Sequence, residues 1–216
     1  MTEHGDTPRD ERHVVVDRRG EFLKYTDREA PASYPDFFHA MRGLMDLAVA
    51  ADADDDAYRR AAEKIGEVAA ILEPHREAVE AAGPAARTVD LPGRGSVLAP
   101  PWTLDERGPD GIGGTVRFSR FHVGGHAAAH GGAVAHLFDD LYGWVIEAAG
   151  LPIARTAYLK VDYRAVTPVD APVRYAGRID RVDGRKVFLV AELLDEEGSV
   201  LAESEALMVM LRPGAR

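Results

Sequence analysis

The sequence of 216 residues contains no cysteine, which excludes disulfides, thiolate zinc sites and cysteine nucleophiles. Any chemistry must therefore come from carboxylates, histidines, hydroxyls and backbone amides. The first residues lack the apolar segment of a secretory signal, and no apolar run approaches the roughly 18 residues needed to cross a bilayer. We therefore expect a cytoplasmic protein with no membrane partner.

Basic residues are also scarce, since 26 Lys and Arg face 36 Asp and Glu, for a formal net charge of −10. This balance argues against nucleic-acid binding, which needs a clustered basic surface. An anionic ligand would have to be met by a local group of basic side chains. The hydrophobic content of 46% is enough to bury one substantial core.

Apolar residues recur at helical spacing over residues 36–48 and again over 58–72, where Pro74 ends the pattern. Two amphipathic helices are therefore predicted after a charged lead-in at residues 1–31. Glycine and proline concentrate in residues 83–101, which indicates a connector. We divide the chain into an extension (1–90) with two helices and a linker, and a main domain (91–216). The helices are expected to pack on the main domain or to cover a dimer.

The main domain alternates apolar and polar residues in several short runs, as half-buried strands do. The predicted strands lie near Val97–Trp102 and at Gly114–Phe121, Thr156–Val166, Val173–Val182, Val187–Leu194 and Val200–Leu211. Asp183-Gly184 is a hairpin signal, because both residues tolerate positive φ. Ala133–Ala149 reads as one nearly apolar helix. These elements predict an α+β fold in which a curved antiparallel sheet wraps one long central helix, with the last four strands as consecutive neighbours.

Two adjacent carboxylates interrupt this apolar helix. At about 100° per residue from Val134, Asp139 lies near about 140°, beside small and apolar residues, whereas Asp140 falls on a polar arc. A partly desolvated Asp139 would gain basicity, which suits a general base or a nucleophile. An aspartate that caps a loop or pairs with an arginine is the structural alternative, at about even odds for an isolated residue. Gly131 and Gly132 start the helix and leave N–H groups free to stabilise an oxyanion.

The pattern His130-Gly131-Gly132, then Asp139, then the strand TAYLKVDYRAVTP resembles the hotdog-fold acyl-CoA thioesterases of the phenylacetate-pathway (PaaI-like) type. The resemblance covers residues 96–212 and implies a cofactor-free hydrolysis of acyl-CoA to a carboxylic acid and coenzyme A. It assigns Asp139 as base or nucleophile, the amide of Gly131 or Gly132 as the group that polarises the thioester, and Thr156 as a hydroxyl that holds the attacking water.

The resemblance departs at one place, because Gly124 stands where related enzymes often have an asparagine. His126 in the same loop is a candidate substitute for that side chain. We expect His130 to orient the turn by hydrogen bonding. His122, His126 and His130 are spaced four apart, as metal ligands on a helix would be, but the glycines among them indicate a loop, so no metal is expected.

The resemblance also implies a homodimer, and it leaves a dimer of dimers open. The two sheets would join edge to edge, and the glycine turn of one subunit would face Asp139 of the other. Arg181, Arg185 and Lys186 form the best local basic cluster for the phosphates of coenzyme A, although the sequence alone slightly favours an ordinary charged hairpin tip.

Two other functions stay open on the sequence. A hotdog hydratase or dehydratase would act on acyl-CoA without cleaving the thioester, and a non-catalytic acyl-CoA-binding protein would keep only the fold. A phosphate loop at residues 111–114 is set aside, because a strand and no Lys-Ser or Lys-Thr follows it. The sequence has no Gly-x-Ser-x-Gly elbow of a serine hydrolase.

Overall fold

The computed structural model describes residues 30–76, 83–88 and 90–212, and the predicted lead-in falls almost entirely outside them. Two helices come first, α1 (Tyr34–Ala50) and α2 (Asp55–Leu72), and α3 (Gly131–Ala148) is the third. The strands are β1 (Trp102–Gly108), β2 (Gly111–Val116), β3 (Ala154–Tyr163), β4 (Val173–Asp183), β5 (Lys186–Leu194) and β6 (Val200–Met210). Within the described chain, no helix is long and apolar enough to cross a membrane.

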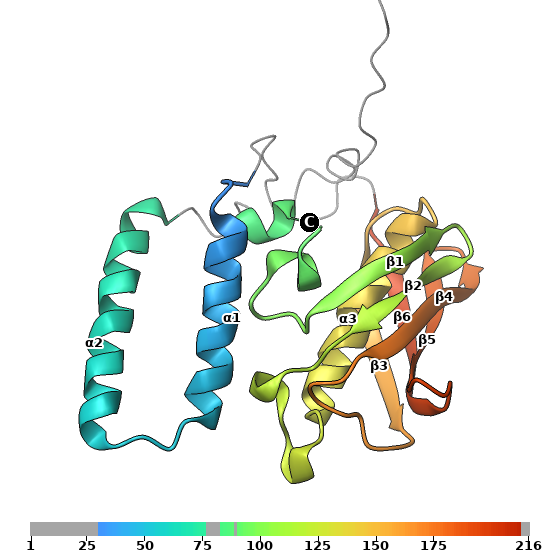
Figure 1. Ribbon diagram of the computed structural model, residues 1–216. Coiled ribbons are helices and arrows are strands. Elements are labelled where there is room, and N and C mark those ends of the chain that lie inside the picture. The colour runs from blue at the N-terminus through green and yellow to red at the C-terminus, as the bar shows by residue number, and fades with distance from the viewer. Residues whose placement is uncertain (1–29, 77–82, 89, 213–216) are drawn as a thin grey trace, which may run out of the picture.

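The six strands form one antiparallel sheet in the order β1-β2-β4-β5-β6-β3, which curves around α3 (Figure 1). This arrangement confirms the predicted α+β fold with a central helix. α3 is buried on the side that its apolar stripe defines, and Tyr142 anchors it by a hydrogen bond of 2.7 Å between its hydroxyl and Ser204 Oγ on β6. Burial raises the pKa of Tyr142 to about 12, so its hydroxyl stays neutral in this contact.

The predicted strand neighbours were partly wrong. β3 does not lie beside β4 but at the far edge of the sheet, paired with β6, while β4 pairs with β2 and β5. Nine residues, 164–172, connect β3 to β4. An extended connection of that length reaches about 30 Å, whereas three strand spacings measure only about 14 Å. Chain reach therefore does not force these two strands together.

Strand boundaries shifted as well. The first strand begins at Trp102, where the sequence analysis expected it to end, and residues 111–114 belong to β2 itself. Asp183 pairs with Lys186, so the β4–β5 turn consists of Gly184, with φ +56°, and Arg185. The tight hairpin predicted from Asp183-Gly184 is confirmed, with the turn displaced by one residue.

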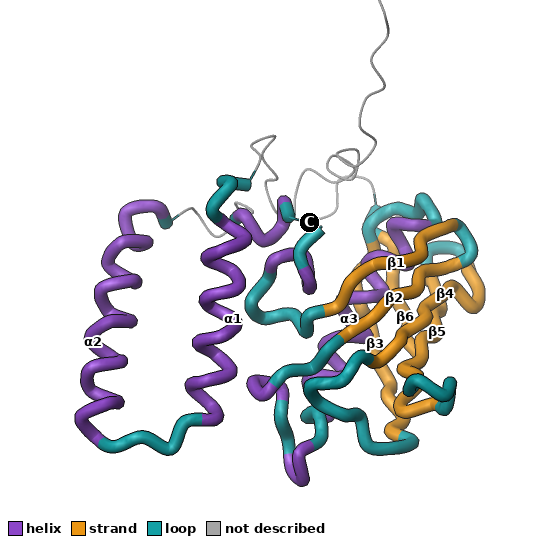
Figure 2. The backbone as a smooth tube through the Cα atoms, in the orientation of Figure 1, coloured by secondary structure: helices purple, strands orange, loops and turns teal. Residues whose placement is uncertain are grey.

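The two predicted N-terminal helices are present and differ in their packing. α1 lies against the short 3₁₀ helix η5 (Arg120–His122), and its Phe38 is 2% exposed. α2 runs beside α1 (Figure 2) and has no buried residue. Of the two, only α1 is thus packed firmly against the sheet-and-helix unit.

Candidate functional site

The N-terminus of α3 carries the His130-Gly131-Gly132 turn. His130 is the N-cap residue, and its Nδ1 accepts a hydrogen bond of 2.9 Å from the N–H of Gly132. An accepting Nδ1 places the proton of a neutral ring on Nε2. The Tyr163 hydroxyl on β3 donates to the Gly131 carbonyl at 2.7 Å, a contact that the sequence does not reveal because 32 residues separate the partners.

These hydrogen bonds distinguish the Gly131 amide from the Gly132 amide, which the sequence left as equal candidates for the oxyanion donor. The Gly132 N–H is engaged by His130, whereas the Gly131 N–H has no hydrogen-bond partner among the described residues. A methyl group at position 131 would approach the Tyr163 hydroxyl to 3.1 Å, so glycine also permits the close packing of this turn. Gly131 is therefore the amide that remains available for a ligand oxygen.

Asp139 lies two turns further along α3 and meets Thr156 of β3. The Thr156 hydroxyl donates to Asp139 Oδ1 at 2.8 Å. Oδ2 has no partner among the described residues. The predicted carboxylate was partly desolvated, but Asp139 is exposed in the single chain. The chain alone does not supply the dry groove, because small neighbours on α3 leave that side of the helix open.

A β-bulge explains why Thr156 reaches Asp139. Strict alternation would place Thr156 on the opposite face of β3 from Leu159. The register of β3 with β6 shifts between Thr156 and Tyr158, so Thr156 pairs with the buried Met208, on the face that covers α3. Bulges often re-aim a side chain beside a functional site. The sequence analysis thus named the correct strand, but alternation alone would put Thr156 on the wrong face.

Asp140 has a structural role in this chain. Its Oδ2 accepts a hydrogen bond of 2.7 Å from Trp102 Nε1, and its Oδ1 pairs with Arg94. The Asp140 side chain is 12% exposed and Trp102 is 2% exposed. The arginine-paired alternative thus applies to Asp140, and Asp139 remains the unpaired carboxylate of the two.

The length of α3 limits which groups can act together. Gly131 and Asp139 are eight residues apart on one helix, which corresponds to a rise of about 12 Å. The attacking atom must lie about 3 Å from the acyl carbon, and the oxyanion donor must lie about 3 Å from the carbonyl oxygen bonded to that carbon. The Asp139 and Gly131 of one chain therefore cannot serve the same acyl group.

Gly124 is packed in a way that accounts for the missing asparagine. A Cβ at this position would lie 3.0 Å from the Cα of His130, so a side chain there requires the loop to shift. The Gly124 N–H donates to the Ala128 carbonyl at 2.7 Å. His126 follows with φ +58° and an exposed side chain that has no polar partner in the described chain. Within the described residues, no hydrogen bond joins His126 to Gly131 or Asp139.

The predicted basic cluster lies around the β4–β5 turn, on the sheet face away from α3. Arg181 stacks over the Phe188 ring at 3.7 Å and pairs with Asp180 at 2.9 Å, and Arg185 Nη1 donates to the Met210 carbonyl at 2.9 Å. Lys186 is exposed. The structure therefore gathers these side chains near one another but does not bring them to Asp139 within a chain.

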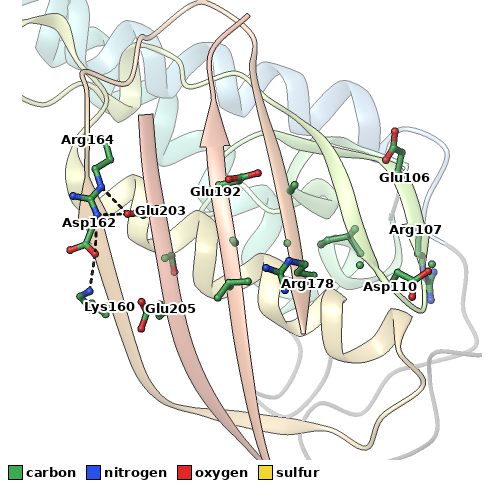
Figure 3. A pocket seen from close by; sticks show the side chains of 18 residues that line it. Glu106, Arg107, Asp110, Lys160, Asp162, Arg164, Arg178, Glu192, Glu203 and Glu205 are labelled. Atoms are coloured by element: carbon green, nitrogen blue, oxygen red, sulfur yellow. Dashed lines mark hydrogen bonds and ion pairs between the residues drawn. The ribbon is translucent and has the colours of Figure 1, made fainter. Parts of the chain in front are cut away.

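A groove of about 840 Å³ also lies on the sheet face away from α3 (Figure 3). Glu203 and Glu205 line it and alternate with the buried Ser204 that faces α3. Ion pairs cross its wall, including Lys160 with Asp162 at 2.8 Å and Arg164 with Glu203. None of the predicted site residues lines this groove, so it is separate from the α3 site.

His122 is the one buried histidine among the described residues, at 6% exposure. Its Nδ1 accepts from the Ser119 N–H at 3.1 Å. Burial, and then the positive charge of Arg42, lower its pKa from 6.5 to about 4. His122, His126 and His130 do not form a metal-binding group, and none was found elsewhere in the part of the chain that the structure describes.

Comparison with known proteins shows which family this fold resembles. Residues 126–202 match the family model of the thioesterase superfamily. The crystal structure of a thioesterase superfamily protein aligns with a TM-score of 0.72 and 26% sequence identity, over 84% of this chain and 97% of that chain. Residues 126–202 thus match the thioesterase superfamily, and the predicted resemblance to that superfamily is confirmed.

A curated relative matches a similar part of the chain. Acyl-coenzyme A thioesterase THEM4 from Xenopus laevis is 32% identical over 87 residues, which is 39% of this chain. The chain aligns with 38% of the length of that relative.

Proposed function

We propose that this protein is an acyl-CoA thioesterase that hydrolyses acyl-CoA to a carboxylic acid and free coenzyme A. The observation that carries the proposal is the hydrogen bond of 2.8 Å from the Thr156 hydroxyl to Asp139, inside the segment that matches the thioesterase superfamily. The curated acyl-coenzyme A thioesterase from Xenopus laevis supports the same chemistry and substrate class.

Asp139 would activate the attacking water or attack the thioester carbon itself. Thr156 holds Oδ1, so Oδ2 is left to accept the water proton or to form the new bond. The C–S bond then breaks, and the sulfur of coenzyme A leaves as a thiolate with the electron pair of that bond and takes up a proton to give the free thiol. Water supplies the hydroxyl of the acid, and no redox partner or metal is required for the balance.

The Gly131 N–H would stabilise the oxyanion that develops on the thioester carbonyl. It lies at the positive end of α3, and its hydrogen has no partner in the described chain. Removal of one such donor costs on the order of 3 kcal/mol in other acyl-transfer enzymes. Because Gly131 and Asp139 of one chain lie about 12 Å apart along α3, each acyl group would use the Gly131 of one subunit and the Asp139 of the other.

A homodimer supplies this arrangement. β3 is an edge strand of ten residues: β6 pairs with one side of it, and no strand of the described residues pairs with the other. Such an edge is a template for pairing with another strand. Pairing of β3 with a second copy of β3 would continue the sheet and cover the exposed Asp139 and Thr156, which would supply the desolvation that one chain lacks.

The phosphates of coenzyme A are assigned to Arg181, Arg185 and Lys186. These residues cluster at the β4–β5 turn, away from Asp139. The long pantetheine arm of coenzyme A separates its phosphates from the thioester, so this separation is compatible with one bound molecule. His126 stays a candidate for a contact with the substrate near the turn.

The test is the release of free thiol from a panel of acyl-CoA thioesters. Asp139→Ala should lower kcat by about a thousandfold, the range of a lost general base, while the dimer persists in sedimentation. Thr156→Val should cause a smaller loss, and Asp140→Asn should affect stability more than turnover. Equal thiol release by wild type and Asp139→Ala would refute the mechanism. Turnover without thiol release would indicate a hydratase, and binding without turnover a binding protein.

A further inference from the structure

The side of α1 that faces the main domain carries three residues at a helical spacing of four, Phe38, Arg42 and Asp46. Phe38 is buried at 2% exposure, and Arg42 Nη2 donates to the Ser96 carbonyl at 2.8 Å and to that of Ala99. Asp46 Oδ1 accepts a hydrogen bond of 2.8 Å from the Phe121 N–H. α1 is therefore fixed to the connector before β1 and to η5.

η5 is also hydrogen-bonded to the His130-Gly131-Gly132 turn. The carbonyl of His122, the residue after Phe121, accepts the His130 N–H at 2.7 Å. The bridge between Val123 and Ala129 closes the intervening loop, so residues 122–130 form a hairpin-like unit. A displacement of η5 would be passed directly to His130, whose backbone leads into the Gly131 N–H.

The turn has other tethers, but they come from other elements than α1 and η5. The Ala129 N–H donates to the Thr167 carbonyl at 2.9 Å, and the Tyr163 hydroxyl holds the Gly131 carbonyl. Both partners belong to the strand β3 and the connection after it. Among the described residues, the contact of Asp46 with the Phe121 N–H is the one hydrogen bond between α1 and η5, because Arg42 bonds to the connector instead.

We propose that Asp46 is a positioning residue for thioester hydrolysis, which holds the Gly131 oxyanion donor in place through η5 and His130. The inference rests on the proposed function and gives the N-terminal extension a role in it. Oxyanion stabilisation depends on donors held within a few tenths of an ångström of their productive positions, and a misplacement of about 1 Å can cost about a hundredfold in rate. A smaller displacement of the Gly131 N–H should lower the rate by less than this factor.

The test compares Asp46→Ala, which removes the acceptor, with Asp46→Asn, which keeps an Oδ1 acceptor and removes the charge. Asp36→Ala on the exposed side of α1 is the matched control. Asp46→Ala should lower kcat about tenfold with KM changed less than about twofold, and Asp46→Asn should restore kcat to within about twofold of wild type. Asp36→Ala should behave as wild type.

Amide hydrogen exchange gives a readout that does not depend on activity. The Phe121 and His130 amides should exchange about fivefold faster in Asp46→Ala than in wild type and Asp46→Asn, because the loss of one hydrogen bond of about 1 kcal/mol corresponds to that factor. If wild type releases no thiol, the proposed function fails and the exchange pattern still decides the positioning role.

Three results would overturn the inference: unchanged kcat and exchange in Asp46→Ala, equal losses in Asp46→Ala and Asp46→Asn, or an unprotected Phe121 amide in wild type. An unprotected Phe121 amide in wild type would overturn the inference even if Asp46→Ala does not fold.

Discussion

Acidification should destabilise this protein through His122. The ring is buried between Phe118 and Phe121, with ring centroids 5.8 Å and 5.7 Å away, and its Nε2 is buried without a partner in the described chain. The charged groups around it are Arg42 and Asp46 on α1, with His136 on α3. A proton on this ring would have to be accommodated in a site that already holds a guanidinium.

The size of the effect follows from the pKa. Folding lowers the pKa of His122 from 6.5 to about 4, so the unfolded chain binds the proton first. The contribution of neutral His122 is present above pH 6.5, and it is lost as the pH falls from 6.5 to about 4. Each pKa unit corresponds to about 1.4 kcal/mol, so the loss amounts to about 3 kcal/mol.

Urea unfolding at a series of pH values measures this loss, with His122→Asn as the comparison. The Oδ1 of asparagine can accept the Ser119 N–H as Nδ1 does, but asparagine takes up no proton. The free energy of unfolding should fall by about 3 kcal/mol more in wild type than in His122→Asn between about pH 7.5 and pH 4. Parallel pH profiles for the two proteins would refute the reasoning.

Two further substitutions test the surroundings of the site. Arg94→Leu should lower the free energy of unfolding by about 2 kcal/mol, because it leaves Asp140 buried with Trp102 as its remaining partner. This is less than the cost of breaking a fully buried ion pair, since Arg94 is 32% exposed. In the same urea assay Arg59→Leu, which breaks the exposed pair with Asp55 on α2, should cost less than about 0.5 kcal/mol, and equal losses would contradict the assignment. Gly124→Ala should cost about 1 kcal/mol and lower kcat, because the new Cβ meets the His130 Cα at 3.0 Å; thiol release at the wild-type rate would show that the loop yields freely.

Local patterns predicted the elements of the fold but not all of their neighbours. The helical stripe of α3 and the alternation in β4, β5 and β6 were sufficient, because each reflects burial against a single core. The edge position of β3 was missed, since alternation records which face of a strand is buried and not which strand lies beside it. The bulge that turns Thr156 toward α3 interrupts the alternation and was missed for the same reason.

The candidate site was likewise predicted only in part from the sequence. The helical position of Asp139 predicted that it differs from Asp140, and the partners of Asp140 explain the difference. Those partners, Arg94 and Trp102, lie 46 and 38 residues away in sequence and carry no local signal. The surroundings of Asp139 were predicted less well, because a dry groove needs surfaces that its own helix does not provide. Likewise, nothing near Asp46 in sequence indicates its bond to Phe121.

The separation of Gly131 and Asp139 along α3 has a consequence for mixtures of subunits. On the proposed dimer, each of the two reaction centres takes its Gly131 from one subunit and its Asp139 from the other. A pair that joins a subunit defective only at position 131 to one defective only at position 139 therefore concentrates both defects in one centre and leaves the other intact. Two inactive parents would in this way yield hybrids that retain one working centre.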